Sequence, residues 1–133
     1  MRKSLLAALL AASLPALAAD PAWVGEARSV AGSVPPKLVA VLTEELGKTG
    51  PEGAIAVCSV KAPEMAKAAS EATGWNIRRV SLRNRNPKAV PDAWERAALE
   101  EFDRRATAGE PPAALEKFAV VKEDGRDVYR YMK

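Results

Sequence analysis

Cys58 has the most distinctive chemistry in this sequence, because it is the single cysteine of a 133-residue chain that contains no histidine. A disulfide within the chain needs a second cysteine, and zinc sites built from Cys and His need several such ligands. A cysteine nucleophile normally needs a basic partner, most often His. Two interpretations remain open. Cys58 is either a small side chain buried on a helix, or a thiol that binds metal or haem iron or acts in redox chemistry.

A dense group of positive charges is the second chemical feature. Arg78, Arg79, Arg83, Arg85 and Lys88 fall within eleven residues. Arginine binds carboxylate and phosphate groups through two parallel hydrogen bonds, so haem propionates, an acidic metabolite or a lipid head group would suit this segment. The alternative is a solvated edge whose charges form local ion pairs.

Helices are expected to position Cys58. Residues 23–33 and 35–48 read as helix, with apolar residues of the second stretch at three- and four-residue spacing. The two prolines at 35 and 36 either begin a new helix or kink one long helix. Residues 47–53 read as a loop, and residues 54–60 as the helix that carries Cys58.

Further along, residues 63–72 predict a helix that ends at Gly74. Residues 75–82 alternate in a way that predicts a strand carrying two of the arginines, and residues 83–91 read as a loop. The next helix should begin at Asp92, because Glu95 three residues later completes a capping box.

The last sixteen residues predict a β-hairpin, since two β-prone runs flank Asp124-Gly125. Tyr129 and Tyr131 would share one face of its second strand and either line a pocket or pack. The order of elements predicts an α+β domain, in which N-terminal and other helices flank a small antiparallel sheet. We expect one domain over residues 20–133, with the native product either ending at Lys133 or continuing past it.

The first nineteen residues resemble a Sec-type signal peptide. A basic start is followed by an apolar run too short to cross a membrane, and Ala16-Leu17-Ala18 predicts cleavage after Ala18 or Ala19. We therefore expect a periplasmic or secreted protein that does not span the membrane once processed. Loss of Arg2 and Lys3 leaves 18 Lys and Arg against 17 Asp and Glu, a net charge of +1 that gives no argument for nucleic acid.

Catalytic motifs are missing from the sequence. It contains no serine-nucleophile motif, no phosphate-binding glycine loop and no metalloprotease pattern. We therefore expect a binding or sensory domain rather than an enzyme.

Two stretches together, AIAVCSVKAPEMA at 54–66 and GWNIRRVSLRNRNPKAVPDAWE at 74–95, resemble a bacterial family of exported or membrane-tethered sensor domains. That family is catalogued as a domain of unknown function, and its structural representative is a cyanobacterial c-type haem protein with a PAS-like fold. The positions that match are Ala54-Ile55, Cys58, Ala62-Pro63, Gly74-Trp75, Arg79, Ser81-Leu82, Arg85-Asn86-Pro87, Pro91-Asp92 and Trp94-Glu95.

The resemblance implies a PAS-like sheet flanked by helices and a haem pocket in which Cys58 is an axial ligand. It further implies that Arg79, Ser81, Arg83 and Arg85 bind the cofactor, and that the domain signals or exchanges electrons with a partner protein. Haem-bearing relatives continue into a C-x-x-C-H attachment motif, which this sequence lacks. Either the native product is longer, or haem is not attached covalently. The alternative function is a non-haem module that binds a small anion or a partner at the Arg79–Arg85 edge.

Overall fold

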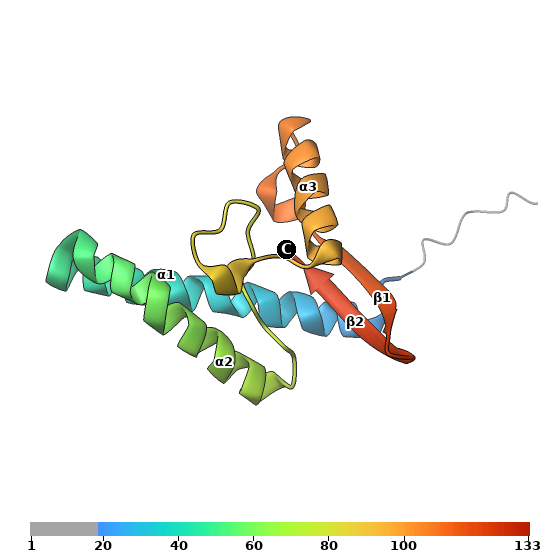
Figure 1. Cartoon of the computed structure of the whole chain (residues 1–133), viewed down its shortest axis with the longest axis horizontal. Helices are drawn as coiled ribbons and strands as arrows, with labels where there is room; N and C mark the ends of the chain where they lie inside the picture. Colours follow the sequence, from blue (N-terminus) through green and yellow to red (C-terminus); the bar gives the residue numbers. More distant parts are fainter. Residues whose placement is uncertain (1–18) are drawn as a thin grey trace, which may run out of the picture.

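The computed structural model describes residues 19–133, so all but the last residue of the predicted signal peptide lies outside the described residues. Within these residues, three helices and two strands follow one another, with short 3₁₀ or π turns between some of them (Figure 1). In chain order they are α1 (Ala22–Ala56), the π-helical turn η1 (Val57–Lys61), α2 (Ala62–Thr73), the 3₁₀ turn η2 (Pro87–Ala89), α3 (Ala93–Thr107), the 3₁₀ turn η3 (Pro112–Ala114), β1 (Lys117–Glu123) and β2 (Arg126–Met132).

The predicted α+β class is confirmed, because helices flank an antiparallel sheet of two strands, β1 and β2. One face of this β-hairpin carries Phe118 and Tyr129, which contact Trp23 of α1. The other face carries Arg130, which contacts Asp92 and Trp94 at the start of α3. The β-hairpin therefore lies between α1 and α3. The PAS-like character of the fold stays a prediction.

α1 runs without a break across Pro35 and Pro36, so one long helix and not two begins this domain. Its direction changes only at Gly50, whose φ of 70° and ψ of −159° are essentially restricted to glycine. The predicted loop at 47–53 is thus reduced to one residue, and Pro51 begins the next helical stretch as its fixed φ favours. A Cβ at Gly53 would lie 1.7 Å from Thr49 Oγ1, which shows how closely the two stretches meet.

After Gly50 the chain stays helical from residue 51 to residue 73. Residues 22–49 and 51–73 form a helical hairpin, which extends to the left in Figure 1. Val57, only 1% exposed, is buried where its two arms meet. One ion pair in the described residues joins the arms, since Lys61 Nζ lies 3.5 Å from Glu45 Oε1. None of the helices within residues 19–133 combines the length and the hydropathy needed to cross a bilayer.

The predicted strand at 75–82 is wrong. These residues are extended but have no strand partner. Their backbone is satisfied in other ways: the Ile77 amide donates to Ser70 Oγ at 2.9 Å, and the Ser81 amide donates to the Ala89 carbonyl at 3.1 Å. Alternation of side chains predicts which residues can share a face, but a strand also needs a neighbour, which local sequence does not specify.

α3 begins as predicted. Asp92 accepts from the Glu95 amide at 2.9 Å, and Glu95 accepts from the Asp92 amide at 2.8 Å, which completes the capping box. The apolar stripe of α3 faces inward, with Ala98 and Phe102 both buried. This cap fixes where the helix starts, and it therefore fixes the place of Trp94 against the β-hairpin.

The β-hairpin has the predicted turn. Asp124 and Gly125 both have positive φ, of 49° and 75°, as a two-residue turn of this hand requires. Val120 pairs with Tyr129 and Phe118 with Tyr131. The register thus places both tyrosines on the face toward α1.

The core of the described residues is small and is split between three places. Val24 and Ala27 are buried on α1, Val57 at the helical hairpin, and Ala98 and Phe102 on α3. No polar side chain is buried in this part of the chain. Polar contacts between elements at partly exposed positions therefore contribute much of what holds the elements together.

Candidate functional site

Cys58 lies on the surface of the helical hairpin, so the interpretation of this residue as a buried side chain is wrong. It belongs to η1, one turn of π-helix between α1 and α2. The Ala62 amide donates to the Val57 carbonyl, five residues back, which is the hydrogen bond that defines a π-helix. A π-helical turn interrupts the regular hydrogen bonding of an α-helix, and such turns are often found at functional sites.

Apolar side chains surround the π-helical turn. Ile55 and Val60 are 70% and 54% exposed, which is high for aliphatic residues in a folded domain. An open hollow of about 370 Å³ lies beside the turn, between the two arms. Its lining residues are Val41, Lys61, Glu64, Met65 and Ala68. Cys58 does not line this hollow, so Ile55 and Val60 are the exposed apolar side chains nearest to it in the sequence.

The predicted arginine site is a separate feature, the basic loop (residues 79–88). Arg79, Arg83 and Arg85 are exposed there, and none of them forms an ion pair within residues 19–133. Ser81 is engaged in the loop itself, because its amide binds the Ala89 carbonyl and its hydroxyl accepts from the Arg83 amide at 3.2 Å. Arg78, just before the loop, instead binds the Glu95 carboxylate at 2.5 and 3.0 Å.

No hydrogen bond or ion pair in the described part of the chain joins the basic loop to the π-helical turn. That Cys58 and the arginines act on one cofactor therefore stays a prediction. Residues 19–133 also contain no group of three or more Cys, Asp or Glu side chains placed to hold a metal ion.

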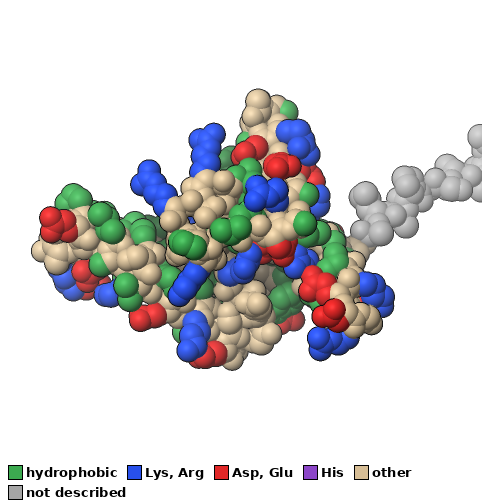
Figure 2. Space-filling view, viewed as in Figure 1, with side chains coloured by type: hydrophobic (Ala, Val, Ile, Leu, Met, Phe, Trp, Pro, Cys, Tyr) green, Lys and Arg blue, Asp and Glu red, His purple; other side chains and the backbone are tan. Residues whose placement is uncertain are grey.

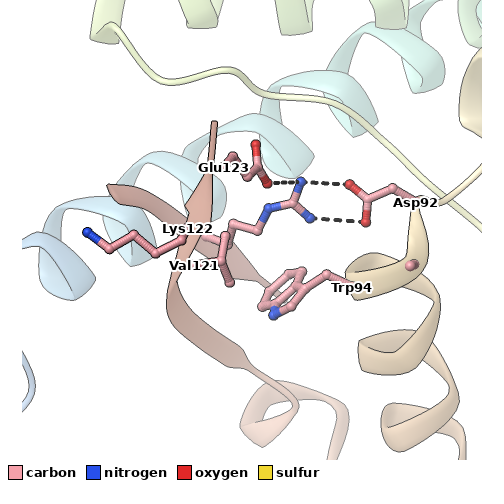
Figure 3. A pocket seen from close by; sticks show the side chains of 7 residues that line it. Asp92, Trp94, Val121, Lys122 and Glu123 are labelled. Carbon is pink, nitrogen blue, oxygen red and sulfur yellow. Dashed lines mark hydrogen bonds and ion pairs between the residues drawn. The ribbon is translucent and has the colours of Figure 1, made fainter. Parts of the chain in front are cut away.

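A third feature, at the junction of α3 and the β-hairpin, was missed by sequence reasoning (Figure 3). The Arg130 guanidinium binds both oxygens of Asp92, at 3.0 and 2.7 Å, and Glu123 at 2.9 Å. It also lies 5.5 Å from the centre of the Trp94 ring. These side chains line an open groove of about 340 Å³, together with Val121. Alternation placed Arg130 on one face of β2, but nothing local pointed to Asp92, 38 residues away.

The charges of this groove are already matched. The hydrogen bonds from Arg130 lower the pKa of Asp92 to about 2, despite partial burial that acts in the opposite direction. The same contacts raise the pKa of Arg130. Because Arg130 is saturated by two carboxylates, the groove joins two elements and offers little free charge to a ligand.

A second polar cluster joins α1 to the β-hairpin. Arg28 binds Glu116 at 2.9 and 2.5 Å and Asp20 at 2.9 Å, while the Tyr131 hydroxyl donates to Glu116 at 2.7 Å. The hydrogen bonds from Arg28 hold the pKa of Glu116 at about 2. Burial, together with the hydrogen bond to Glu116, raises the pKa of Tyr131 to about 12. Tyr131 is therefore partly buried and hydrogen-bonded at the junction of α1 and the β-hairpin.

Tyr129 belongs to a cluster of four aromatic side chains. Trp23 lies 6.4 Å from Trp75, 5.8 Å from Phe118 and 5.2 Å from Tyr129, measured between ring centres. Trp75 Nε1 also donates to Glu26 at 2.9 Å. These rings fill the space between α1, the extended segment after α2 and the β-hairpin, so their contacts are structural.

One comparison with known proteins gives a result. The family model described as Tll0287-like (Tll0287) matches residues 9–133. No curated protein matches the chain, and no solved structure does. The match covers both the π-helical turn and the basic loop.

Proposed function

This chain belongs to the Tll0287-like family, and from that premise we propose that it is an exported haem-binding domain with a sensory or redox role. In this proposal Cys58 is an axial ligand of the haem iron. The domain acts by a change in ligation or oxidation state, not by turnover of a substrate.

One observation carries the proposal: the only thiol of the chain is exposed on a π-helical turn. A free cysteine that merely packs is normally buried, since cysteine is among the most buried residue types. The π-helical turn departs from regular helix at this one place in residues 51–73. Val57 of the same turn is buried between the arms, whereas Cys58 presents a soft donor at the surface, which is expected of a ligand.

The residues present fit a haem group in their chemistry. The porphyrin supplies four nitrogen ligands, so a single protein sulfur is enough to hold the iron, and the lack of a His or acidic cluster is no obstacle. Ile55 and Val60 provide exposed apolar surface beside Cys58. Bound haem would supply an iron centre that accepts an electron or exchanges its sixth ligand.

The chain's own residues would have two tasks. Cys58 would hold the iron of a bound haem through its sulfur, and a thiolate ligand there would favour the oxidised state. Arg79, Ser81, Arg83 and Arg85 are the proposed partners of the propionates, because they provide cationic and hydroxyl donors on one loop. The three arginines have no acidic partner within the described ranges, which leaves their charges available.

The test is the visible absorption spectrum of the mature protein, recorded while haem is added. We expect a Soret band that saturates at one haem per chain. Cys58→Ser should shift the band or abolish it, because a hydroxyl is a poor ligand for haem iron. Ser59→Ala is the matched control, since Ser59 lies in the same π-helical turn and its hydroxyl binds only the Ile55 and Ala56 carbonyls.

An identical band in the native protein and in Cys58→Ser would remove Cys58 from the ligands. The absence of any band in the native protein would overturn the haem proposal as a whole. Export is tested separately: the N-terminus of the protein recovered from the periplasm should be Ala19 or Asp20, and recovery only of cytoplasmic protein that begins at Met1 would contradict it.

A further inference from the structure

Charge is strongly segregated along this chain. Residues 72–91 contain five Lys and Arg and no Asp or Glu. That leaves 13 Lys and Arg against 17 Asp and Glu over the rest of residues 19–133. A domain whose net charge is close to zero therefore concentrates its positive charge in one segment of twenty residues. Such a segment attracts anions far more strongly than the net charge suggests.

Four of these five charges are free. Arg78 is neutralised by Glu95, but Arg79, Arg83, Arg85 and Lys88 are all exposed and form no ion pair with the acidic residues of the described region. Figure 2 shows Lys and Arg side chains that stand out from the surface where this loop lies in Figure 1. Elsewhere in the structure, basic residues such as Arg28 and Arg130 are held by carboxylates from other elements.

The basic loop is closed at its base by several hydrogen bonds. Arg78 Nη2 donates to the Val90 carbonyl at 3.0 Å, and the Ser81 amide donates to the Ala89 carbonyl at 3.1 Å. The Asn86 side chain accepts from the Lys88 amide at 2.9 Å and caps the turn η2. The chain is thus ordered before it meets a partner, so little backbone entropy is lost when it binds.

The arrangement of the cations in the basic loop indicates the kind of partner that they bind. A site for a small anion needs several donors that converge on a hollow. Neither of the two hollows described above is lined by a residue of the basic loop. Its charges stand on an outward-facing loop, beside Val90, which is 48% exposed. The cations of the basic loop point outward, lie next to an exposed apolar side chain and have no acid among them. This arrangement fits an extended anionic surface better than a single small ion.

We propose that the basic loop docks this domain on an anionic lipid surface, with Arg79, Arg83, Arg85 and Lys88 against the head-group phosphates. The docking involves neither haem nor Cys58, but it uses Arg79, Arg83 and Arg85, which the proposed function assigns to the propionates, so the two roles are alternatives for these three side chains. A cation close to an anionic bilayer strengthens binding by roughly fivefold. Four cations together should therefore strengthen it by on the order of several hundredfold at low ionic strength.

The experiment uses haem-free mature protein and sedimentation with vesicles. One set contains equal parts of phosphatidylglycerol and phosphatidylcholine, and the other contains phosphatidylcholine alone. The loop variant carries Arg79→Gln, Arg83→Gln, Arg85→Gln and Lys88→Gln. The control variant loses the same charge elsewhere, through Lys37→Gln, Arg96→Gln, Arg104→Gln and Arg126→Gln, four exposed residues that also form no ion pair in the described region.

We expect the native protein and the control variant to bind the anionic vesicles, and the loop variant to lose on the order of a hundredfold or more in partition coefficient. Binding should weaken as salt is added and be absent on neutral vesicles. Equal loss in both variants would show a net-charge effect and would overturn the proposal. A native protein that does not bind anionic vesicles would also overturn the proposal. So would a native protein that short duplex DNA or inorganic phosphate displaces from these vesicles. Circular dichroism of each variant checks that the fold is kept.

Discussion

Glu116 offers the sharpest test of how the β-hairpin is held to α1. Its carboxylate accepts from Arg28 on α1 and from Tyr131 on β2, so it links both elements at one point. Glu116→Gln keeps the size of the side chain and one acceptor oxygen but removes the negative charge. Arg28 then loses its main partner, although Asp20 remains at 2.9 Å.

The expected loss follows from the pKa of Glu116, which lies at about 2 in place of its ordinary 4.5. Since each pKa unit corresponds to about 1.4 kcal/mol, the full effect would be about 3 kcal/mol. Solvent reduces this figure, because the side chains of Glu116 and Arg28 are 24% and 39% exposed. We therefore expect Glu116→Gln to lower the free energy of unfolding by about 1–2 kcal/mol at pH 7.

The effect must depend on pH in a defined direction. The folded state lowers the pKa of Glu116, so its contribution is complete above about 4.5 and is lost as the pH falls toward about 2. The difference in unfolding free energy between native protein and Glu116→Gln should thus shrink over that range. Urea unfolding at a series of pH values measures it.

Glu100→Gln is the matched control, since Glu100 is exposed on α3 and forms no ion pair in the described region. It should leave stability unchanged. If Glu116→Gln destabilised the protein by the same amount at every pH, the loss would come from packing, and the charged contact with Arg28 would contribute nothing. If it had no effect at pH 7, the link between α1 and the β-hairpin would rest on the aromatic contacts alone.

Two further substitutions test the local geometry. Gly50→Ala should destabilise the protein by about 1–3 kcal/mol, because its φ of 70° with ψ of −159° suits only glycine. The control is Gly47→Ala, inside the helix, which should be neutral or stabilising by up to about 1 kcal/mol. Equal effects of Gly50→Ala and Gly47→Ala on thermal unfolding would refute the change of chain direction at Gly50. Asp92→Asn keeps a good helix cap but removes the charge that faces Arg130. It should cost about 1 kcal/mol at pH 7, with the difference from native protein vanishing as the pH falls from about 3.8 to about 2; an unchanged difference across that range would contradict the ion pair.

Local signals predicted the elements that depend on local chemistry. The capping box at Asp92 and the Asp124-Gly125 turn each involve residues at most three apart, and the structure confirms both. The strand expected at 75–82 failed because pairing depends on a distant neighbour, and the Ser70 hydroxyl takes the Ile77 amide instead. The prolines at 35 and 36 left two alternatives, and the structure selects one continuous helix.

The candidate site shows the same division. Residue type alone singled out Cys58 and the arginines of the basic loop. A single cysteine and a basic segment without Asp or Glu can both be recognised directly in the sequence. The π-helical turn that exposes Cys58 has no recognisable sequence signal, so its exposure could not be predicted. The groove around Arg130 was missed because its partners, Asp92 and Glu123, come from two elements that meet only in the folded chain.

Cations that are paired with carboxylates of other elements have a structural role in this domain, and the basic loop differs from the other unpaired cations of the described residues because its four charges lie close together in the sequence with no acid among them. With so few buried side chains, the helices and the β-hairpin depend on cations that reach across elements, as Arg28 does to Glu116 and Arg130 to Asp92. A free cation contributes nothing of this kind and adds repulsion to its neighbours. Arg78 illustrates the contrast, because it is neutralised by Glu95 and closes the base of the loop whose other cations stay unpaired. Arg78 thus holds in place a loop that carries four unpaired cations. This arrangement is expected when those cations bind an anionic partner.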